Sequence, residues 1–345
     1  MLKKKVRLLD LKSRTLKILI SIVERYIQTG RPVGSKAIYE LLEDSPSPST
    51  IRNEMASLTA MGFLEQPHVS SGRVPSINGY KVYINNIPYG DISETEKNYI
   101  YGMFSGSSFD PESVLREASE VLSKITNCTI VFAAPPVGDS LVREVKFIKI
   151  GKRTPMLILI TSSGMVQNQI FNCDFDINDD ILHMFEKSVN EEFRNRKIKD
   201  LLLDANKIIF NKDSKDIIIT SAFKASFSAV KKICQNRVGV EGKKRLFQFQ
   251  EVPRAFEILN FVEEEDFSKF IFSSSSKIKV YLGNDSKIDI FSECSVVVEK
   301  YRVSELNEGA IIVVGPVRMN YPDVISKLDY IVRIIEGIFS AFLNL

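Results

Sequence analysis

Four neighbouring polar residues have side chains that can hydrogen-bond to nucleic acid. They are Ser49, Thr50, Arg52 and Asn53. Arginine presents two parallel N–H donors to guanine O6 and N7, and asparagine pairs with adenine N6 and N7. Serine and threonine hydroxyls bind phosphate oxygens. The chemistry available to this run is therefore recognition of base edges in a duplex, together with contacts to its backbone.

A predicted helix positions these residues on one face. Ser47 is a good N-cap and Pro48 a good first helical residue, since proline there loses no needed N–H. Gly62 is expected to close the helix. Apolar residues recur at helical spacing and predict a buried stripe behind the polar face: Ile51, Met55 and Leu58.

The flanking segments predict a winged helix-turn-helix. Two helices precede the polar one, at about residues 12–28 and 35–43, and two short strands follow it, at 63–67 and 73–75. In this arrangement the third helix enters the major groove, and the ribbon tip meets phosphate or the minor groove. We expect further DNA contacts from the second helix and the wing: Ser35, Lys36, His68, Ser70, Ser71 and Arg73, with Lys81 behind the wing.

Charge favours nucleic acid as the partner of this region. Residues 1–90 contain 13 Lys and Arg against 7 Asp and Glu, whereas residues 91–345 contain 33 against 36. A basic head on a nearly neutral remainder is the pattern expected of a DNA-binding domain. The alternatives are a three-helix module for protein contacts, a wing in which Arg73 pairs with Glu65, and a capping role for His68 in its loop.

Several motifs resemble those of one repressor family. They are PVGSK at 32–36, SPSTIRNEM at 47–55, GFLEQPH at 62–68, SGRVP at 71–75 and GPVRMNY at 315–321. Together they resemble the bacterial heat-inducible transcription repressors of the HrcA family. The resemblance implies a homodimeric repressor of chaperone operons that binds an inverted-repeat operator, the CIRCE element. It also implies release on heat shock and modulation of the active form by the chaperonin GroEL.

The rest of the chain predicts an α+β, multidomain protein. Strand patterns at 129–171 and 278–314 are separated by three amphipathic helices at about 177–193, 198–211 and 216–234, as in a domain interrupted by an insertion. The resemblance implies a GAF-like α/β domain interrupted by a mostly helical inserted dimerisation domain. We expect the helices of the insertion to carry the self-contact. The expected boundaries are 1–90 for the head, 91–108 for a linker helix, 109–173 and 251–345 for the divided domain, and 174–250 for the insertion.

The sequence contains no catalytic constellation. His68 and His183 are the only histidines, and the four cysteines are widely separated: Cys128, Cys173, Cys234 and Cys294. Such cysteines are typical of reduced thiols in a cytoplasmic protein. No nucleotide-binding or zinc motif occurs, and the acidic runs at 176–180 and 263–266 are typical of solvated helix ends. We therefore expect no enzyme activity, no cofactor and no metal, and no apolar run is long enough to span a membrane.

Two further hypotheses concern the divided domain. Arg318 follows the last predicted strand, and we expect it to fix the final helix against the sheet, with anion binding as the alternative. GAF-like folds often contain a small-molecule pocket. The second hypothesis for function is therefore a metabolite-sensing regulator with DNA binding as its output, and a protein scaffold is the third.

Overall fold

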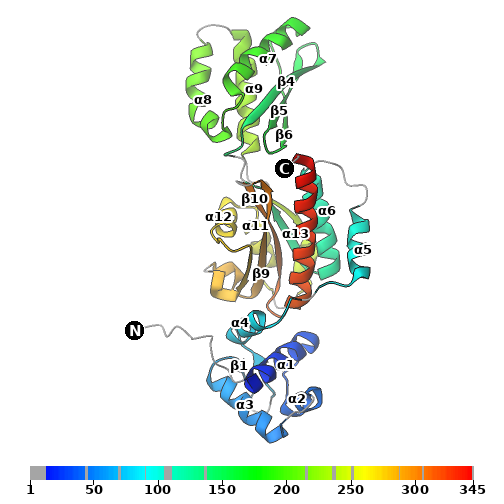
Figure 1. Ribbon diagram of the computed structural model, residues 1–345. Coiled ribbons are helices and arrows are strands. Elements are labelled where there is room, and N and C mark those ends of the chain that lie inside the picture. Colours follow the sequence, from blue (N-terminus) through cyan, green and yellow to red (C-terminus); the bar gives the residue numbers. More distant parts are fainter. Residues whose placement is uncertain are drawn as a thin grey trace.

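The computed structural model describes residues 13–42, 46–68, 71–89, 91–104, 111–135, 138–213, 217–234, 238–249, 252–286, 288–304 and 307–343. These residues form three parts arranged along one axis (Figure 1). The head comprises the described residues up to 89, the insert comprises 138–234, and the body comprises the others. The predicted α+β, multidomain fold class is confirmed. No helix within these described ranges is both long and apolar enough to cross a bilayer.

The head contains the predicted helices and wing. They are α1 (Ser13–Thr29), α2 (Ser35–Leu41), α3 (Pro48–Ala60), β1 (Leu64–Glu65), β2 (Val74–Pro75) and α4 (Ile77–Asn86). β1 and β2 pair antiparallel, with Leu64 opposite Pro75. The buried stripes of α1 and α3 face each other in the core: Ile18, Leu19, Ile22, Val23, Ile51, Met55 and Leu58.

A close approach between α4 and the wing requires a glycine. A Cβ at Gly79 would lie 2.2 Å from the carbonyl oxygen of Phe63. Ser76 caps α4 by accepting a hydrogen bond from the Gly79 N–H at 3.2 Å, and it donates to the Gly62 carbonyl at 2.7 Å. Glycine lowers helix propensity by roughly 1 kcal/mol relative to alanine. Its presence here is explained by packing.

The body is a three-layer α/β/α domain around an antiparallel sheet of order β7-β3-β10-β9-β8. The strands are β3 (Thr129–Ala133), β7 (Val238–Glu241), β8 (Ile278–Leu282), β9 (Cys294–Ser304) and β10 (Asn307–Pro316). On one face lie α6 (Pro111–Thr126) and α13 (Tyr321–Leu343), with α5 (Glu94–Met103) beside α6 (Figure 1). On the other lie α10 (Lys243–Leu246), α11 (Ala255–Phe261) and α12 (Glu265–Phe272). Two short 3₁₀ turns, η1 (Gly283–Ser286) and η2 (Asp289–Phe291), connect β8 to β9.

The insert has its own sheet, which differs from the sequence-based boundaries. β4 (Val142–Gly151), β5 (Thr154–Thr161) and β6 (Val166–Ile170) form a separate three-stranded sheet, although we expected them in the divided domain ending at 173. β7, which the expected boundary at 250 placed in the insertion, pairs with β3 of the body. The period of a pattern identifies a strand but not its partner. One divided sheet was therefore expected where the chain forms two.

In the described part of the chain, helices cover only one face of the insert sheet. α7 (Asp179–Phe193), α8 (Ile198–Asp213) and α9 (Ile217–Ile233) share a buried core with the inward residues of the strands, including Phe147, Leu157 and Leu159. The opposite rows of the sheet run Ile148–Met156–Ile170, Lys146–Ile158–Asn168 and Glu144–Ile160–Val166. The exposed fractions of Ile148, Val166 and Ile170 are 45%, 56% and 54%. This face is therefore rich in exposed apolar side chains.

The body contains a buried carboxyl group, Glu299 of β9. Its side chain is 0% exposed, and both carboxylate oxygens lack a hydrogen-bond partner within the described residues. Burial, reinforced by repulsion from Asp329, raises the pKa of Glu299 to about 8, although Lys277 Nζ lies 3.5 Å away and opposes the shift. A carboxyl group with this pKa is mostly protonated at neutral pH.

We expect Glu299 to make stability depend on pH. The folded state holds a proton that the unfolded chain releases near pH 4.5, so the free energy of unfolding should fall as pH rises from about 4.5 to about 8. Glu299→Gln should reduce this decline, as measured by urea unfolding at several pH values. Exposed Glu293→Gln serves as the control. An unchanged decline in the Glu299 variant would contradict the assignment.

Candidate DNA-binding surface

The N-terminus of α3 is fixed by the predicted cap. Ser47 Oγ accepts a hydrogen bond from the Thr50 N–H at 3.3 Å, and Pro48 is the first helical residue. Ser47 Oγ also lies 2.8 Å from Ser49 Oγ and 3.0 Å from Thr50 Oγ1. The hydroxyls of Ser49 and Thr50 therefore belong to the capping network, and they can offer only their remaining hydrogen-bonding capacity to phosphate.

Arg52 and Asn53 are exposed on α3, while its predicted stripe is buried. Ile51 and Leu58 are both 0% exposed, and Met55 is 4% exposed. Packing of this stripe against α1 leaves the guanidinium and amide groups outside the core. A recognition helix uses side chains near its N-terminus in this way to reach base edges. This arrangement agrees with the geometry expected from the sequence.

Glu54 orients α3, and the sequence reasoning missed it. Its Oε1 accepts a hydrogen bond from Arg14 Nη2 at 2.9 Å, and its Oε2 accepts one from Thr15 Oγ1 at 2.9 Å. Both donors lie on α1, about forty residues earlier in the chain. The two bonds resist rotation of α3 about its own axis, which would turn Arg52 and Asn53 away from a groove. The sequence signal is weak, because spacing does not reveal a partner so distant.

Ser71 closes the turn of the wing. Its Oγ donates to the His68 carbonyl at 2.6 Å and accepts from the His68 N–H at 2.9 Å, and its own N–H donates to the same carbonyl at 2.9 Å. The His68 side chain is exposed, so it is better placed for an outside contact than the Ser71 hydroxyl. The predicted contact at Ser70 lies outside the described residues.

Arg73 is directed toward α3. Its Nε donates to Thr59 Oγ1 at 3.0 Å, so the hydroxyl of Thr59 takes the place of the carboxylate of Glu65 as its partner. The backbone of Arg73 exchanges two hydrogen bonds with Val33, each 2.8 Å long. Arg73 thus ties the wing to α3 and to the segment that leads into α2, and its first role is structural.

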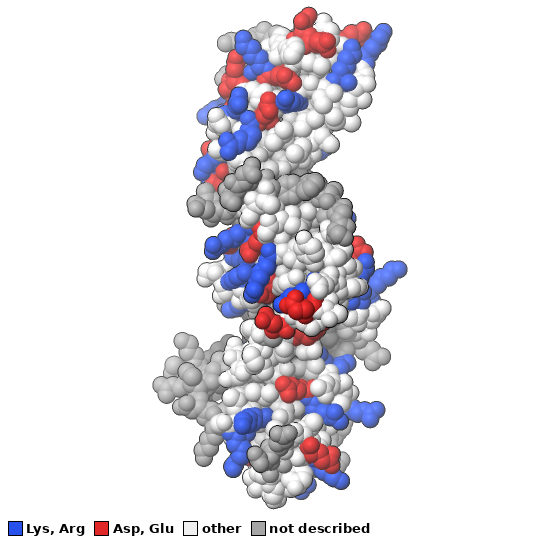
Figure 2. Space-filling view, turned by 45° about the vertical axis from the view of Figure 1, so that its right-hand side comes forward, with Lys and Arg blue, Asp and Glu red and all other residues white. Residues whose placement is uncertain are grey.

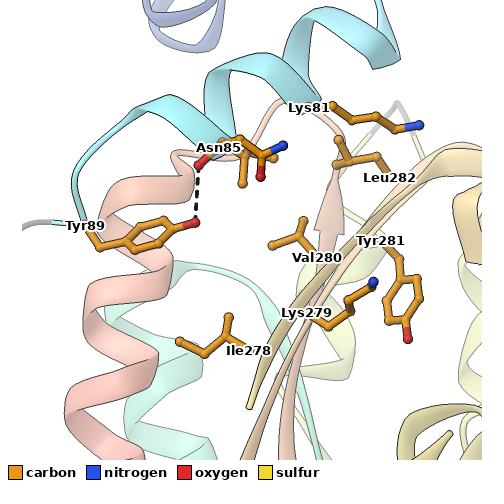
Figure 3. A pocket seen from close by; sticks show the side chains of 9 residues that line it. Lys81, Asn85, Tyr89, Ile278, Lys279, Val280, Tyr281 and Leu282 are labelled. Carbon is orange, nitrogen blue, oxygen red and sulfur yellow. Dashed lines mark hydrogen bonds between the residues drawn. The ribbon is translucent and has the colours of Figure 1, made fainter. Parts of the chain in front are cut away.

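The two lysines among the predicted DNA contacts, Lys36 and Lys81, differ in position. Lys36 is exposed in the first turn of α2, next to half-buried Ser35. Lys81 instead lies on α4 and lines a cavity of about 580 Å³ between α4 and β8 of the body (Figure 3). α4 lies next to the body, and α3 lies at the opposite end of the head (Figure 1). The structure brings α3, the wing and the start of α2 together and places Lys81 apart from them.

The visible charges agree with this orientation. In Figure 2, acidic side chains gather low on the body, just above the head, while the head itself shows Lys and Arg side chains together with a few separate acidic ones. The acidic group would repel phosphate from the junction between head and body. Duplex DNA is therefore better accommodated at the end of the head that is remote from the body.

The acidic runs form no metal site among the residues that the structure describes. Within the described ranges, no three His, Cys, Asp or Glu residues form a group that could hold a metal ion. The acidic runs take part in surface ion pairs, among them Asp176 with Arg153 at 2.8 Å and Glu263 with Lys243 at 3.0 Å. All four cysteines are free thiols.

Similarity to known proteins extends along nearly the whole chain. Residues 10–87 match a family model described as the winged helix-turn-helix DNA-binding domain of HrcA transcription repressors, and residues 112–325 match the HrcA C-terminal domain. Heat-inducible transcription repressor HrcA of Halalkalibacterium halodurans is 30% identical over 336 residues, covering 93% of this chain and 95% of the relative. The HrcA protein of Clostridium perfringens is 29% identical over 330 residues, covering 93% and 96%.

A solved structure shows a similar fold. A crystal structure described only as that of a hypothetical protein superposes with a TM-score of 0.72 at 22% identity, covering 96% of this chain and 99% of the other. The likeness includes the head, the body and the insert.

Proposed function

The chain belongs to the HrcA family of heat-inducible transcription repressors, and we propose that it represses chaperone operons by binding an inverted-repeat operator as a homodimer. The observation that carries the proposal is the exposure of Arg52 and Asn53 on a capped recognition helix, fixed against α1 by Glu54. The operator is the CIRCE element of the family, the complex dissociates on heat shock, and the chaperonin GroEL modulates the active form.

Each DNA contact has a distinct role. Arg52 and Asn53 read base edges in the major groove. Lys36 and His68 hold the sugar–phosphate backbone on either side, with smaller contributions from Ser49 and Thr50, whose hydroxyls are engaged in the cap. We do not include Lys81, because it faces the body.

Lys36→Ala should weaken binding to all sequences alike. Removing one phosphate contact is expected to reduce the slope of log K against log salt by about 0.9, with no change in the preferred sequence. Fluorescence anisotropy across a range of salt concentrations measures both quantities. A change in sequence preference would show that Lys36 contacts a base instead.

The open face of the insert sheet is the proposed pairing surface. It carries Met156, Ile158 and Ile160 on the central strand, flanked by exposed isoleucine and valine side chains on β4 and β6. Exposed apolar patches of this kind mark interaction sites. The inward residues of the insert helices are already buried within the domain, which makes them less suitable than the sheet for the self-contact that we expected of them.

Pairing explains tight and reversible binding. One head makes few phosphate contacts, and linking two heads raises the affinity for a two-site operator by roughly 10²–10⁴-fold without any new contact. Any condition that separates the chains therefore releases the operator. Warming the dimer provides such a condition, and a chaperonin that refolds separated chains restores it.

Footprinting on the chaperone promoters of the source organism tests the proposal. We expect protection of an inverted repeat at the lower of two temperatures, loss of protection at the higher one, and recovery that is faster with chaperonin. A scrambled repeat serves as the control. A folded, associated chain that protects no inverted repeat at low ionic strength would contradict the function.

The cavity next to Lys81 supports a second candidate, ligand-controlled repression. Its volume of about 580 Å³ lies within the usual range of small-molecule sites, and its walls come from both head and body. A thermal-shift screen distinguishes the two candidates. A metabolite that changes operator affinity several-fold favours the second, whereas a temperature response without any ligand favours the first.

A further inference from the structure

Arg318 of the body contacts the end of a head helix. It lies in the turn between β10 and α13, and its Nη1 donates to the carbonyl oxygen of Ile27 in α1 at 3.5 Å. The last carbonyls of a helix lack partners within the helix and carry partial negative charge. A guanidinium placed there complements them. This partner differs from the expectation that Arg318 would fix the final helix against the sheet.

The shape of the helix end matches the guanidinium. Gly30 has φ +64°, and its N–H donates to the Tyr26 carbonyl at 2.8 Å, which ends α1 in a tight turn. A Cβ at Gly30 would lie 3.4 Å from Arg318 Cζ. The arginine therefore lies in van der Waals contact with the turn, where any residue other than glycine would strain the backbone.

A second contact lies between α4 and the body. The rings of Tyr80 and Tyr321 meet edge to face with centroids 6.1 Å apart, and their exposed fractions are 3% and 0%. Tyr321 is held in turn by its hydroxyl, which donates to the Val317 carbonyl at 2.5 Å. The apolar core of the head continues through these rings into the core of the body.

The junction between head and body, which we call the joint, is packed at these contacts and contains a cavity beside β8. Lys81 and Asn85 of α4 face Val280 of β8 across the cavity (Figure 3). This cavity leaves space on the β8 side of the junction, where α4 is not packed against the body. The orientation of the head therefore depends on the contacts made by Arg318 and Tyr321.

We propose that Arg318 and Tyr321 fix the angle of the head on the body and thereby determine the operator spacing that the paired protein accepts. This inference rests on the operator-binding function proposed above. Two heads must reach half-sites separated by about one helical turn or a multiple of it. About five extra base pairs move the second half-site to the other side of the duplex. If the joint is rigid, the second head cannot reach the displaced half-site. If the joint is flexible, the second head can turn to reach it. Arg318 is thus a positioning residue that does not touch DNA.

Spacing preference provides the first test. The affinities of the full chain for an operator of natural spacing and for one lengthened by about five base pairs are compared. We expect the wild-type protein to prefer the natural spacing by roughly 100-fold, since the longer site engages only one head. In Arg318→Ala the preference should fall below about 10-fold, with unchanged binding to a single half-site. Arg116→Ala removes an exposed arginine of α6 as the matched control.

Hydrogen exchange provides a test that does not require DNA. In Arg318→Ala, amides at 26–34 and 77–87 should exchange faster, while those of α3 keep their protection. Arg318→Lys, which retains the charge, should lie between wild type and alanine, and it replaces the alanine variant if α3 also loses protection. Unchanged exchange at the joint, or an unchanged spacing preference, would overturn the proposal. If the wild-type chain does not bind inverted repeats, the proposed operator function is contradicted instead. The exchange rates at 26–34 and 77–87 would then still show whether Arg318 holds the head on the body.

Discussion

Replacing Ile158 with glutamate is expected to separate the two chains of the proposed dimer and to lower operator affinity by roughly 10²–10⁴-fold. Ile158 lies at the centre of the open face of the insert sheet, between Lys146 of β4 and Asn168 of β6. A carboxylate buried in a contact between chains loses its hydration, and an ion pair with the neighbouring Lys146 would offset only part of that cost. Because this position points away from the core beneath the helices, the insert itself should fold normally.

Sedimentation equilibrium measures the pairing, and fluorescence anisotropy measures the operator affinity. Leu203→Glu is the matched control, since this leucine is 82% exposed on α8 and represents the helical surface that the sequence analysis favoured. If Leu203→Glu separates the chains and Ile158→Glu does not, the helices carry the contact and our assignment of the sheet is wrong.

Arg52→Ala is expected to weaken operator binding by about 1–3 kcal/mol and to relax specificity at one base pair. The reason is the loss of a bidentate contact to guanine, which no neighbouring side chain on α3 can replace with the same geometry. Competition with operators altered at each position in turn measures the effect. The variant should accept a changed base at one position that the wild-type protein rejects.

Arg25→Ala separates the effect of geometry from that of charge. Arg25 is an exposed arginine of α1, so its loss removes the same charge from the head without touching the recognition helix. Equal losses in the two variants, with unchanged specificity in both, would show that Arg52 acts only through its charge.

Local signals in the sequence predicted the head well. Ser47 and Pro48 begin α3, and the apolar period gives the correct buried stripe, because caps and amphipathic spacing act within a few residues of the chain. The same reasoning identified the strands at 142–170 but assigned them to the wrong domain. Strand partners depend on long-range packing, which a period of two does not specify.

The candidate site was predictable where exposure follows from helix periodicity. Arg52 and Asn53 belong to this class. The contacts of Arg73 with Thr59 and of Glu54 with Arg14 join distant segments, and the sequence contains no local trace of them. Lys81 was placed near the wing by its proximity in sequence, yet the direction of α4 turns it toward the body.

The separation of the apolar cores has a consequence for the response to heat. Head and body share one continuous core, whereas the insert has a core of its own. The two can therefore melt as independent cooperative units. In the proposed dimer, melting of the insert alone would leave a monomer whose DNA-binding head is still folded. Such a monomer needs only to rebuild one small domain on cooling, so repression can resume without new protein synthesis.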